Sequence, residues 1–527
     1  MQRSILVLVC ASATLLMVAR AASQEYAHKS AGAGQSERKS APTPNLARME
    51  EVVQSFVKNK QFMGAVLVAR GNDVLLDKGY GFANLEWNIP DSPKTKFRLG
   101  SITKQFTAAA ILLLEERGKL KVDDPVKKYM PDAPAAWDKI TIFNLLTHTS
   151  GIPNFTSFSD YPKLEPFSTT PEELVARFRD KPLDFQPGER WSYSNSGYVL
   201  LGYLIEKISG ESYAHFLQDN IFTPLGMVDS GYDSNSTVIQ NRASGYTPNN
   251  EGIVNAGYID MTIPLSAGGL YSTTEDLLRW EQGLFGGKLL SPASLKKMTA
   301  PFKNDYGLGL GISSANGHEE IAHGGGIEGF NTMLAYYPDD KLTVVVLANV
   351  NGAAPQEIAA NLHILADGGS VVLASERKEA KIDPKIFDGY VGSYQLAPKV
   401  ILKITREGDH FMTQATGKGQ VEIFPEGDHD FIAKGRRCPD HLCNGCTGPR
   451  HRADSSPRRS RPTRQASGVR FWDRLPILWA PGFPAWFRTA FKDPSKLCNT
   501  CMQSSILNLI RFAVLSSAKW PPPGSRG

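Results

Sequence analysis

Cysteine is missing from almost the whole of this 527-residue chain. Cys10 lies near the N-terminus and the other five cysteines follow Arg437, so the stretch from Ala11 to Arg437 can form no disulfide, thiolate metal site or cysteine nucleophile. Uncharged apolar runs of about 18 residues are lacking beyond the N-terminal segment, which excludes a protein with several membrane spans. With 41% hydrophobic and 21% charged residues, the chain has material for a globular core and length for several domains.

Three common hydrolase and nucleotide-binding signatures are also absent. The chain has no G-x-S-x-G motif, which argues against an ordinary α/β-hydrolase. It has no H-E-x-x-H motif of zinc proteases, because His318-Glu-Glu lacks the second histidine. It also has no glycine-rich phosphate-binding loop followed by Lys-Ser or Lys-Thr.

The N-terminus has the features of an export signal. A positive start, an apolar stretch from Ile5 to Val18 and the small-x-small sequence Ala19-Arg-Ala predict a cleaved signal peptide over residues 1–22. The alternative is an uncleaved anchor helix. Residues 23–43 are rich in Ser, Ala, Gly and Pro and predict a flexible leader. We therefore expect a periplasmic or secreted protein without a membrane span after cleavage.

Residues 44–366 are predicted to form one large α/β unit. Expected strands lie at 64–70 and 72–78 near its start and at 331–337 and 341–350 near its end, and expected helices at 103–117, 197–208 and 274–284 lie between them. This order predicts a mixed sheet flanked by helices, with its two halves drawn from opposite ends of the unit, and a helical subdomain. A charged linker over 367–385 then leads to a partial antiparallel β domain over 386–435, with strands at 387–394, 400–405, 410–416 and 421–425.

Residues 436–527 differ in composition from everything before them. They contain 13 Arg and 3 Lys against 4 Asp and no Glu, a charge of +12 within a whole-chain charge of +5, so the rest of the chain is acidic at −7. A four-cysteine zinc site and a nucleic-acid-binding tail are two interpretations. The 51 residues between its Cys-x-x-Cys pairs exceed the roughly 15–20 of a zinc ribbon. A third, preferred interpretation is translation in a shifted reading frame, because the tail begins where the β domain breaks off.

A Ser-x-x-Lys sequence carries the first candidate chemistry. Ser101 is expected where the chain enters the helix at 103–117, whose N-terminal N–H groups favour a developing oxyanion. Lys104 lies one turn further on the same face. A lysine in a dry environment can lose its proton near neutral pH and serve as the base for a serine. The alternative is a capping serine beside a solvated lysine.

Two further clusters follow in the chain. Tyr193-Ser-Asn195 places a phenol and an amide two residues apart before a helix, and the alternative for the phenol is a core tyrosine. His323-Gly324-Gly325-Gly326 places a cation or hydrogen-bond donor beside a strip without side chains, against which a substrate backbone could lie. The alternative here is a glycine-rich turn.

In this order, S-x-x-K, Y-x-N and H-x-G resemble the motifs of penicillin-recognising serine hydrolases: class C β-lactamases, D-Ala-D-Ala carboxypeptidases, D-aminopeptidases of the S12 peptidase type and related esterases. The stretches 145–153, 185–188 and 266–273 match as well, and the resemblance covers about residues 46–366. The β domain after 386 resembles the lipocalin-like C-terminal domain of some of these peptidases. The resemblance implies a β-lactamase/transpeptidase-like fold, with Ser101 as the nucleophile and Lys104 and Tyr193 as general base and proton relay.

The resemblance also implies how a substrate is bound. Asn195 would hold the substrate amide, and His323 would face the substrate carboxylate or Tyr193. The backbone N–H groups of Ser101 and Gly326 would form the oxyanion hole, with no metal and no cofactor. The prediction is an exported serine hydrolase that cleaves a peptide, amide or ester bond through an acyl-enzyme, acting on a small-molecule or peptide substrate and not on nucleic acid.

One departure separates the chain from class C β-lactamases. These usually have Lys-Thr-Gly at the third motif, where this chain has His323-Gly-Gly. Efficient β-lactam hydrolysis is therefore less expected. A true β-lactamase and a penicillin-binding or sensor protein that is acylated without turnover remain the two alternatives.

Overall fold

We analysed a computed structural model of the chain, which describes residues 44–249, 252–315, 317–373, 375–376, 381–397, 400–417, 419–425 and 431–432. The predicted signal peptide, the leader before residue 44 and the basic tail over 436–527 lie outside the described residues. Among the described residues, no helix is both long and apolar enough to cross a membrane.

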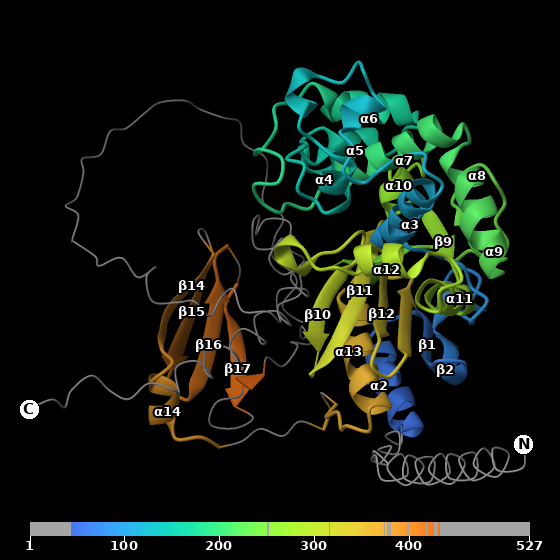
Figure 1. The fold of residues 1–527 in the computed structure, drawn as a ribbon. Coiled ribbons are helices and arrows are strands. Elements are labelled where there is room, and N and C mark those ends of the chain that lie inside the picture. Colours follow the sequence, from blue (N-terminus) through green and yellow to red (C-terminus); the bar gives the residue numbers. More distant parts are fainter. Residues whose placement is uncertain are drawn as a thin grey trace, which may run out of the picture. The chain divides into compact units, whose positions relative to one another are not determined.

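The largest element is a six-stranded sheet in the order β10-β11-β12-β13-β1-β2 (Figure 1). Its strands are β1 (Gly64–Arg70), β2 (Asp73–Tyr80), β10 (Gly311–Ala315), β11 (His318–Ile327), β12 (Phe330–Tyr337) and β13 (Leu342–Ala348). The first strand pairs with the last, Gly64 opposite Ala348 and Arg70 opposite Leu342, so both ends of the unit meet in one sheet as predicted. Every pairing is antiparallel, however, so the prediction of a mixed sheet was wrong in this respect.

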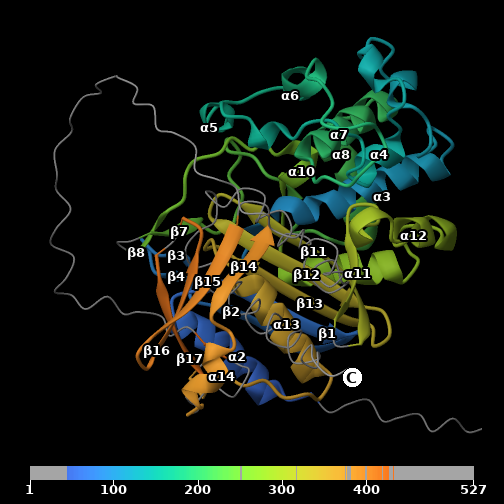
Figure 2. The same cartoon turned by 90° about the vertical axis from the view of Figure 1, so that its left-hand side faces the viewer.

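Both faces of the central strands β1 and β13 are buried, which explains why these strands are apolar at nearly every position. On one face, α2 (Leu46–Lys58) and α13 (Ala354–Ala366) pack side by side against Val66, Val68, Val344 and Val346 (Figures 1 and 2). On the other face, Leu67 and Leu347 belong to a larger core that continues into the central helices. This second core supports the segment that carries Ser101.

The helical region lies between β2 and β10 in the sequence, and its helices α4 to α7 lie above the sheet in the view of Figure 1. Its longest helices are α3 (Thr103–Glu116) and α7 (Asn195–Ser209), which contact each other. Gly118 and Gly210 have positive φ just after these helices, as their predicted ends require. The other helices of the region are α4 (Ile142–Leu146), α5 (Tyr161–Leu164), α6 (Pro171–Arg179), α8 (Tyr213–Leu217), α9 (Thr223–Leu225), α10 (Leu265–Gly268), α11 (Thr274–Phe285) and α12 (Pro292–Met298).

Short strands and turns connect these larger elements. A three-stranded sheet joins β5 (Phe97–Arg98), β9 (Leu270–Ser272) and β6 (Gly231–Tyr232), and a one-turn helix η1 (Gly100–Ile102) follows β5 directly. Two small hairpins consist of β3 (Phe82–Asn84) with β4 (Ile89–Pro90), and of β7 (Tyr246–Asn249) with β8 (Gly252–Asn255).

A separate antiparallel sheet follows the linker, in the order β14-β15-β16-β17-β18. Its strands are β14 (Gly392–Ala397), β15 (Val400–Glu407), β16 (His410–Ala415), β17 (Val421–Pro425) and β18 (Phe431–Ile432). The predicted strand at 387–394 was wrong in its first half: Phe387 and Asp388 end a short helix α14 (Pro384–Asp388), and residues 389–391 form the turn before β14. Asp383 caps this helix through its side chain, and Phe387 lies in the small core of this domain.

Candidate active site

Ser101 lies in η1, where β5 turns into α3. The turn requires glycine at position 100, because Gly100 has φ +55° and a Cβ atom there would lie 2.7 Å from the backbone nitrogen of Gly326. Ser101 remains partly exposed, whereas the residues that follow in α3 are buried. The local backbone thus presents one hydroxyl at the beginning of a buried helix.

Lys104 is completely buried and surrounded by oxygen atoms. Its Nζ lies 3.0 Å from Ser101 Oγ, 2.9 Å from Asn195 Oδ1 and 2.7 Å from the carbonyl oxygen of Ala267. Within the part of the chain that the structure describes, no carboxylate forms an ion pair with it. Burial in the absence of a counter-charge lowers the pKa of Lys104 well below its ordinary value of 10.5.

Tyr193 approaches the same serine from the segment before α7. Its hydroxyl group donates a hydrogen bond of 2.7 Å to Ser101 Oγ, and its ring centroid lies 4.8 Å from Lys104 Nζ. Burial raises the pKa of the Tyr193 phenol, so that it keeps its proton at neutral pH. Ser101 Oγ therefore has one contact with a buried amine and one with a neutral phenol.

Asn195 begins α7 and is held in a defined orientation. Its Oδ1 accepts from Lys104, its Nδ2 donates to Thr156 Oγ1 at 3.2 Å, and its backbone N–H donates to Asn154 Oδ1 at 3.0 Å. The structure thus brings Asn195 next to Lys104, a contact that the sequence analysis did not name. A contact between its amide and a substrate stays a prediction.

The three glycines after His323 lie in β11, directly beside η1. A Cβ atom at Gly325 would lie 1.9 Å from the carbonyl oxygen of Leu99, so only glycine fits there. The Thr332 hydroxyl group, on the neighbouring strand, donates to the same carbonyl at 2.8 Å. This close packing places the backbone nitrogen of Gly326 beside Gly100, one residue from Ser101. A Cβ atom at Gly324 would meet Gln356 Nε2 at 3.1 Å, so this position is also confined.

His323 lies in the site with a hydrogen-bond partner at each ring nitrogen. Its Nδ1 lies 2.6 Å from the Gly324 carbonyl oxygen and therefore donates, which leaves Nε2 to accept from the Tyr306 hydroxyl group at 3.0 Å. Desolvation and the nearby Lys104 lower the pKa of His323 to about 4. Of the two alternatives, a cation or a hydrogen-bond donor, the ring at neutral pH is the donor, with its N–H directed to the Gly324 carbonyl oxygen. Its ring lies 6.5 Å from the Tyr193 ring between centroids, with both nitrogens bound to other groups.

His148 is a buried residue of the site to which the sequence interpretation gave no role. Its backbone oxygen accepts from the Ser192 N–H at 2.9 Å, and its ring Nδ1 accepts from the Ser194 N–H at 3.2 Å. The two residues that flank Tyr193 are therefore both bonded to His148, whose ring centroid lies 4.4 Å from that of Tyr193. The sequence signal for His148 was the Leu-Leu-Thr-His-Thr-Ser-Gly stretch. That stretch supported the resemblance to the family, but it did not indicate that His148 contacts the segment around Tyr193.

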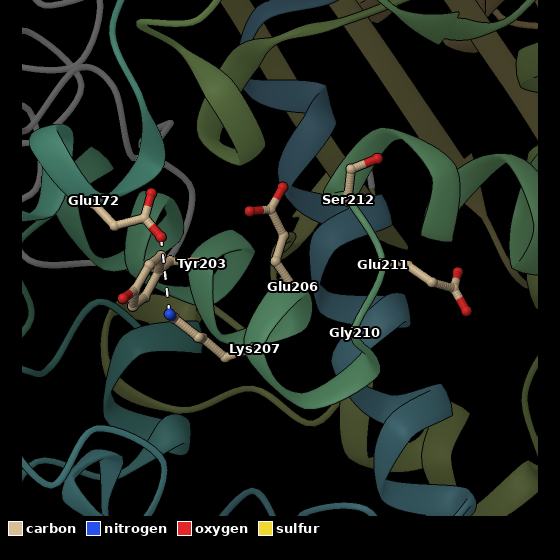
Figure 3. A pocket seen from close by; sticks show the side chains of 7 residues that line it. All are labelled: Glu172, Tyr203, Glu206, Lys207, Gly210, Glu211 and Ser212. Atoms are coloured by element: carbon tan, nitrogen blue, oxygen red, sulfur yellow. Dashed lines mark ion pairs between the residues drawn. The ribbon is translucent and has the colours of Figure 1, made fainter.

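A surface pocket lies at the other end of α7. It is lined by residues of α6, α7 and the turn before α8: Glu172, Tyr203, Glu206, Lys207, Gly210, Glu211 and Ser212 (Figure 3). Lys207 points toward Glu172, 3.9 Å between charged atoms, and Glu206 accepts from the backbone N–H of Tyr213. Lys207 lies twelve positions after Asn195 in α7, which corresponds to roughly 18 Å along the helix axis. This pocket is therefore distinct from the Ser101 site.

Comparison with known proteins agrees with this arrangement. The family model described as Beta-lactamase matches residues 49–368. Penicillin-binding protein 4* of Bacillus subtilis is 30% identical over 421 residues, covering 73% of this chain and 91% of the relative. The octameric penicillin-binding protein homologue from Pyrococcus abyssi is 29% identical with a TM-score of 0.58, covering 74% of this chain and 93% of that one. A D-stereospecific amidohydrolase from Streptomyces sp. is 26% identical with a TM-score of 0.52, covering 60% and 97%.

The fold and the site therefore define a β-lactamase/transpeptidase-like protein. The chain belongs to the beta-lactamase family and is similar to penicillin-binding proteins and to amidohydrolases of that fold. The family and the fold class predicted from the sequence are both confirmed.

Proposed function

We propose that this protein is an exported serine hydrolase that cleaves a peptide, amide or ester bond through an acyl-enzyme on Ser101. The observation that carries the proposal is the position of Ser101 Oγ, within hydrogen-bond distance of both the buried Lys104 amine and the Tyr193 hydroxyl group. A neutral Lys104 has two N–H donors and one lone pair. These match its three contacts, with the carbonyl of Ala267, the amide oxygen of Asn195 and the Ser101 hydroxyl group.

The acylation step follows from these contacts. Lys104 takes the Ser101 proton while Oγ bonds to the substrate carbonyl carbon, and the resulting oxyanion accepts from the N–H groups of Ser101 and Gly326. The proton returns through the Tyr193 hydroxyl group to the leaving nitrogen or oxygen as its bond to carbon breaks. Water then attacks the carbonyl carbon of the acyl-enzyme and loses a proton to the Lys104 and Tyr193 pair. The bond between that carbon and Ser101 Oγ breaks, and the pair returns the proton to Oγ.

The other contacts of the site support binding of a neutral, hydrogen-bonding acyl group. Asn195 is held beside the nucleophile by Asn154 and Thr156, and the glycine strip of β11 offers backbone groups without side chains. The printed title of the Streptomyces relative names an amidohydrolase, which supports amide bonds as substrates. Export and a periplasmic or secreted location are proposed from the N-terminal sequence alone.

Acylation without turnover is the second candidate, supported by relatives named as penicillin-binding proteins. Both are tested by incubating the purified protein and its Ser101→Ala variant with a fluorescent penicillin and with a short-chain nitrophenyl ester. We expect ester turnover that is lost in Ser101→Ala. A stable label on Ser101 without ester turnover supports the second candidate, and turnover by Ser101→Ala excludes both. Rapid penicillin hydrolysis would instead identify a β-lactamase.

A further inference from the structure

A second cluster of titratable side chains lies at the opposite end of β11 from the Ser101 site. His318 begins this strand, Asp340 lies in the turn between β12 and β13, and Asp367 follows the last residue of α13. His318 Nδ1 is 3.3 Å from Asp340 Oδ2, and its Nε2 is 3.2 Å from Asp367 Oδ2. One donor atom from each of the three residues lies within 4.8 Å of the others. His318 precedes His323 by five residues of strand, roughly 16 Å, so the cluster is separate from the catalytic groups.

His363 is a second, independent observation at the same place. Its side chain is only 1% exposed, yet neither ring nitrogen has a hydrogen-bond partner among the described residues. Its ring stacks on Tyr337 at 3.7 Å and faces the His318 ring edge-on, with 5.4 Å between centroids and an interplanar angle of 86°. Leaving a buried polar atom without a partner is unfavourable. A buried imidazole without a partner therefore indicates a bound ion or water beside it.

The donor set matches a first-row divalent metal. One imidazole and two carboxylates are typical ligands of Zn²⁺ and its neighbours, and His318, Asp340 and Asp367 are each partly exposed, so an ion can reach them. Ligands about 2.0–2.1 Å from a tetrahedral zinc ion lie about 3.4 Å from one another. One donor atom from each of the three residues already lies within 4.8 Å of the others, so small side-chain rotations bring them to that spacing. The two carboxylates also supply the negative charge that such an ion requires.

We propose that His318, Asp340 and Asp367 bind one divalent transition-metal ion of the zinc type. One ring nitrogen of His318 coordinates the ion together with the carboxylate beside it. The carboxylate that lies beside the other nitrogen reaches the ion by rotation of its side chain. Water occupies the fourth position and gives the buried His363 ring a hydrogen-bond partner. The ion joins the end of α13 to β11 and to the β12–β13 turn, so its role is structural and the Ser101 reaction does not use it.

The test is a zinc titration of the full chain without an affinity tag, after treatment with EDTA and alkylation of the free cysteines. We expect one equivalent of Zn²⁺ to bind in calorimetry and to raise the melting temperature. The variants Asp367→Asn and His318→Ala should each lose at least tenfold in affinity.

His215→Ala is the matched control, because it removes an exposed histidine that lies 3.1 Å from Asp219 but has no second carboxylate. This variant should bind zinc as the unaltered protein does. Asp367→Asn is nearly isosteric and decides the outcome if His318→Ala fails to fold. The proposal is overturned if the unaltered protein shows no saturable binding, or if Asp367→Asn and His215→Ala bind equally well. Nitrophenyl ester turnover, measured in the same samples, should not respond to the metal.

Discussion

Lys104 combines two properties that are rarely found together in a lysine. It is fully buried, and its contacts are oxygen atoms of neutral groups. A charged ammonium group at such a position is unfavourable by several kcal/mol, so the amine loses its proton more readily. The residue is thereby prepared to act as a base toward the one hydroxyl group that it contacts.

Removing either proton-transfer group should slow acylation without unfolding the protein. We expect Lys104→Met and Tyr193→Phe each to lower the single-turnover acylation rate by ~10²–10⁴. The matched control is Lys207→Met, because Lys207 also lies against a tyrosine ring, that of Tyr203 at 5.0 Å, but on the surface. Stopped-flow measurement with a nitrophenyl ester gives the rates. Normal acylation by both variants would show that the proton follows another route.

The state of Lys104 also predicts the direction of the pH dependence. Its pKa is lowered, and the neutral form is the base, so kcat/KM should rise as pH increases through this pKa and reach a plateau well below pH 10.5. A pH profile of ester hydrolysis measures the midpoint of this rise. A rise that reaches its plateau only near the ordinary lysine pKa would contradict an amine deprotonated by burial.

His148 should act by positioning Tyr193. His148→Ala removes the acceptor for the Ser194 N–H, so the Tyr193 hydroxyl group is no longer held against Ser101 Oγ. Because a displacement of about 1 Å can cost ~10²-fold, we expect kcat to fall by ~10–100-fold with the midpoint of the pH profile unchanged. A shifted midpoint would instead assign His148 to proton transfer. Partial recovery in His148→Asn, whose side-chain oxygen can accept the same N–H, would support positioning.

At the scale of elements, the site depends on how closely β11 packs against η1. Gly325→Ala would place a methyl group 1.9 Å from the Leu99 carbonyl oxygen and push the two elements apart. We expect a loss of about 1–3 kcal/mol in the free energy of unfolding. We also expect kcat to fall by a larger factor than any change in KM, because the Gly326 amide moves with the strand. Gly257→Ala is the control, since a methyl group there meets no atom within 4 Å. Denaturant unfolding and steady-state kinetics measure both effects.

The elements that could be predicted are those whose signal is local. The apolar run of β1 and the apolar face of α3 with Gly118 after it identified both elements almost to the residue, and the Ser-x-x-Lys spacing placed two groups on one helix face. The antiparallel pairing throughout the sheet could not be predicted, because strand direction depends on how the chain returns from the helical region. The short helix α14 begins with a side-chain cap at Asp383, a signal that the strand-like residues after it concealed.

Contacts between distant segments explain what was missed in the site. His148 and Tyr306 reach Tyr193 and His323 across more than 15 residues of chain, and neither lies in one of the three motifs. The charge of His323 depends on desolvation and on Lys104, both of which arise only when the segments pack together. Residue types and spacing therefore predicted the participants, while their protonation states and partners required the fold.

At the scale of the whole molecule, the core contains a carboxyl group without a compensating charge. Glu281 in α11 is 2% exposed, and its Oε2 has no hydrogen-bond partner within the described residues. Burial raises its pKa from 4.5 to about 8. The folded protein therefore holds a proton at neutral pH that the unfolded chain has already released.

This proton makes stability fall as pH rises. Between pH 4.5 and about 8 the folded state binds one more proton at Glu281 than the unfolded state, so the free energy of unfolding should decrease by up to about 1.4 kcal/mol per pH unit from this group. Below pH 4.5 both states are protonated, and above pH 8 both are ionised, so the contribution becomes constant. Glu281→Gln keeps the shape of the side chain and removes the titration. Its stability advantage over the unaltered protein should therefore grow from pH 5 to pH 8.

Denaturant unfolding at several pH values measures this difference, and Glu275→Gln on the same helix provides the control. The Glu275 side chain is 49% exposed, so its substitution should change the free energy of unfolding only slightly. Other carboxylates titrate in both proteins and cancel in the comparison. Curves of Glu281→Gln and the unaltered protein that run parallel from pH 5 to pH 8 would show that Glu281 is already ionised in the folded state, with a partner that compensates its charge.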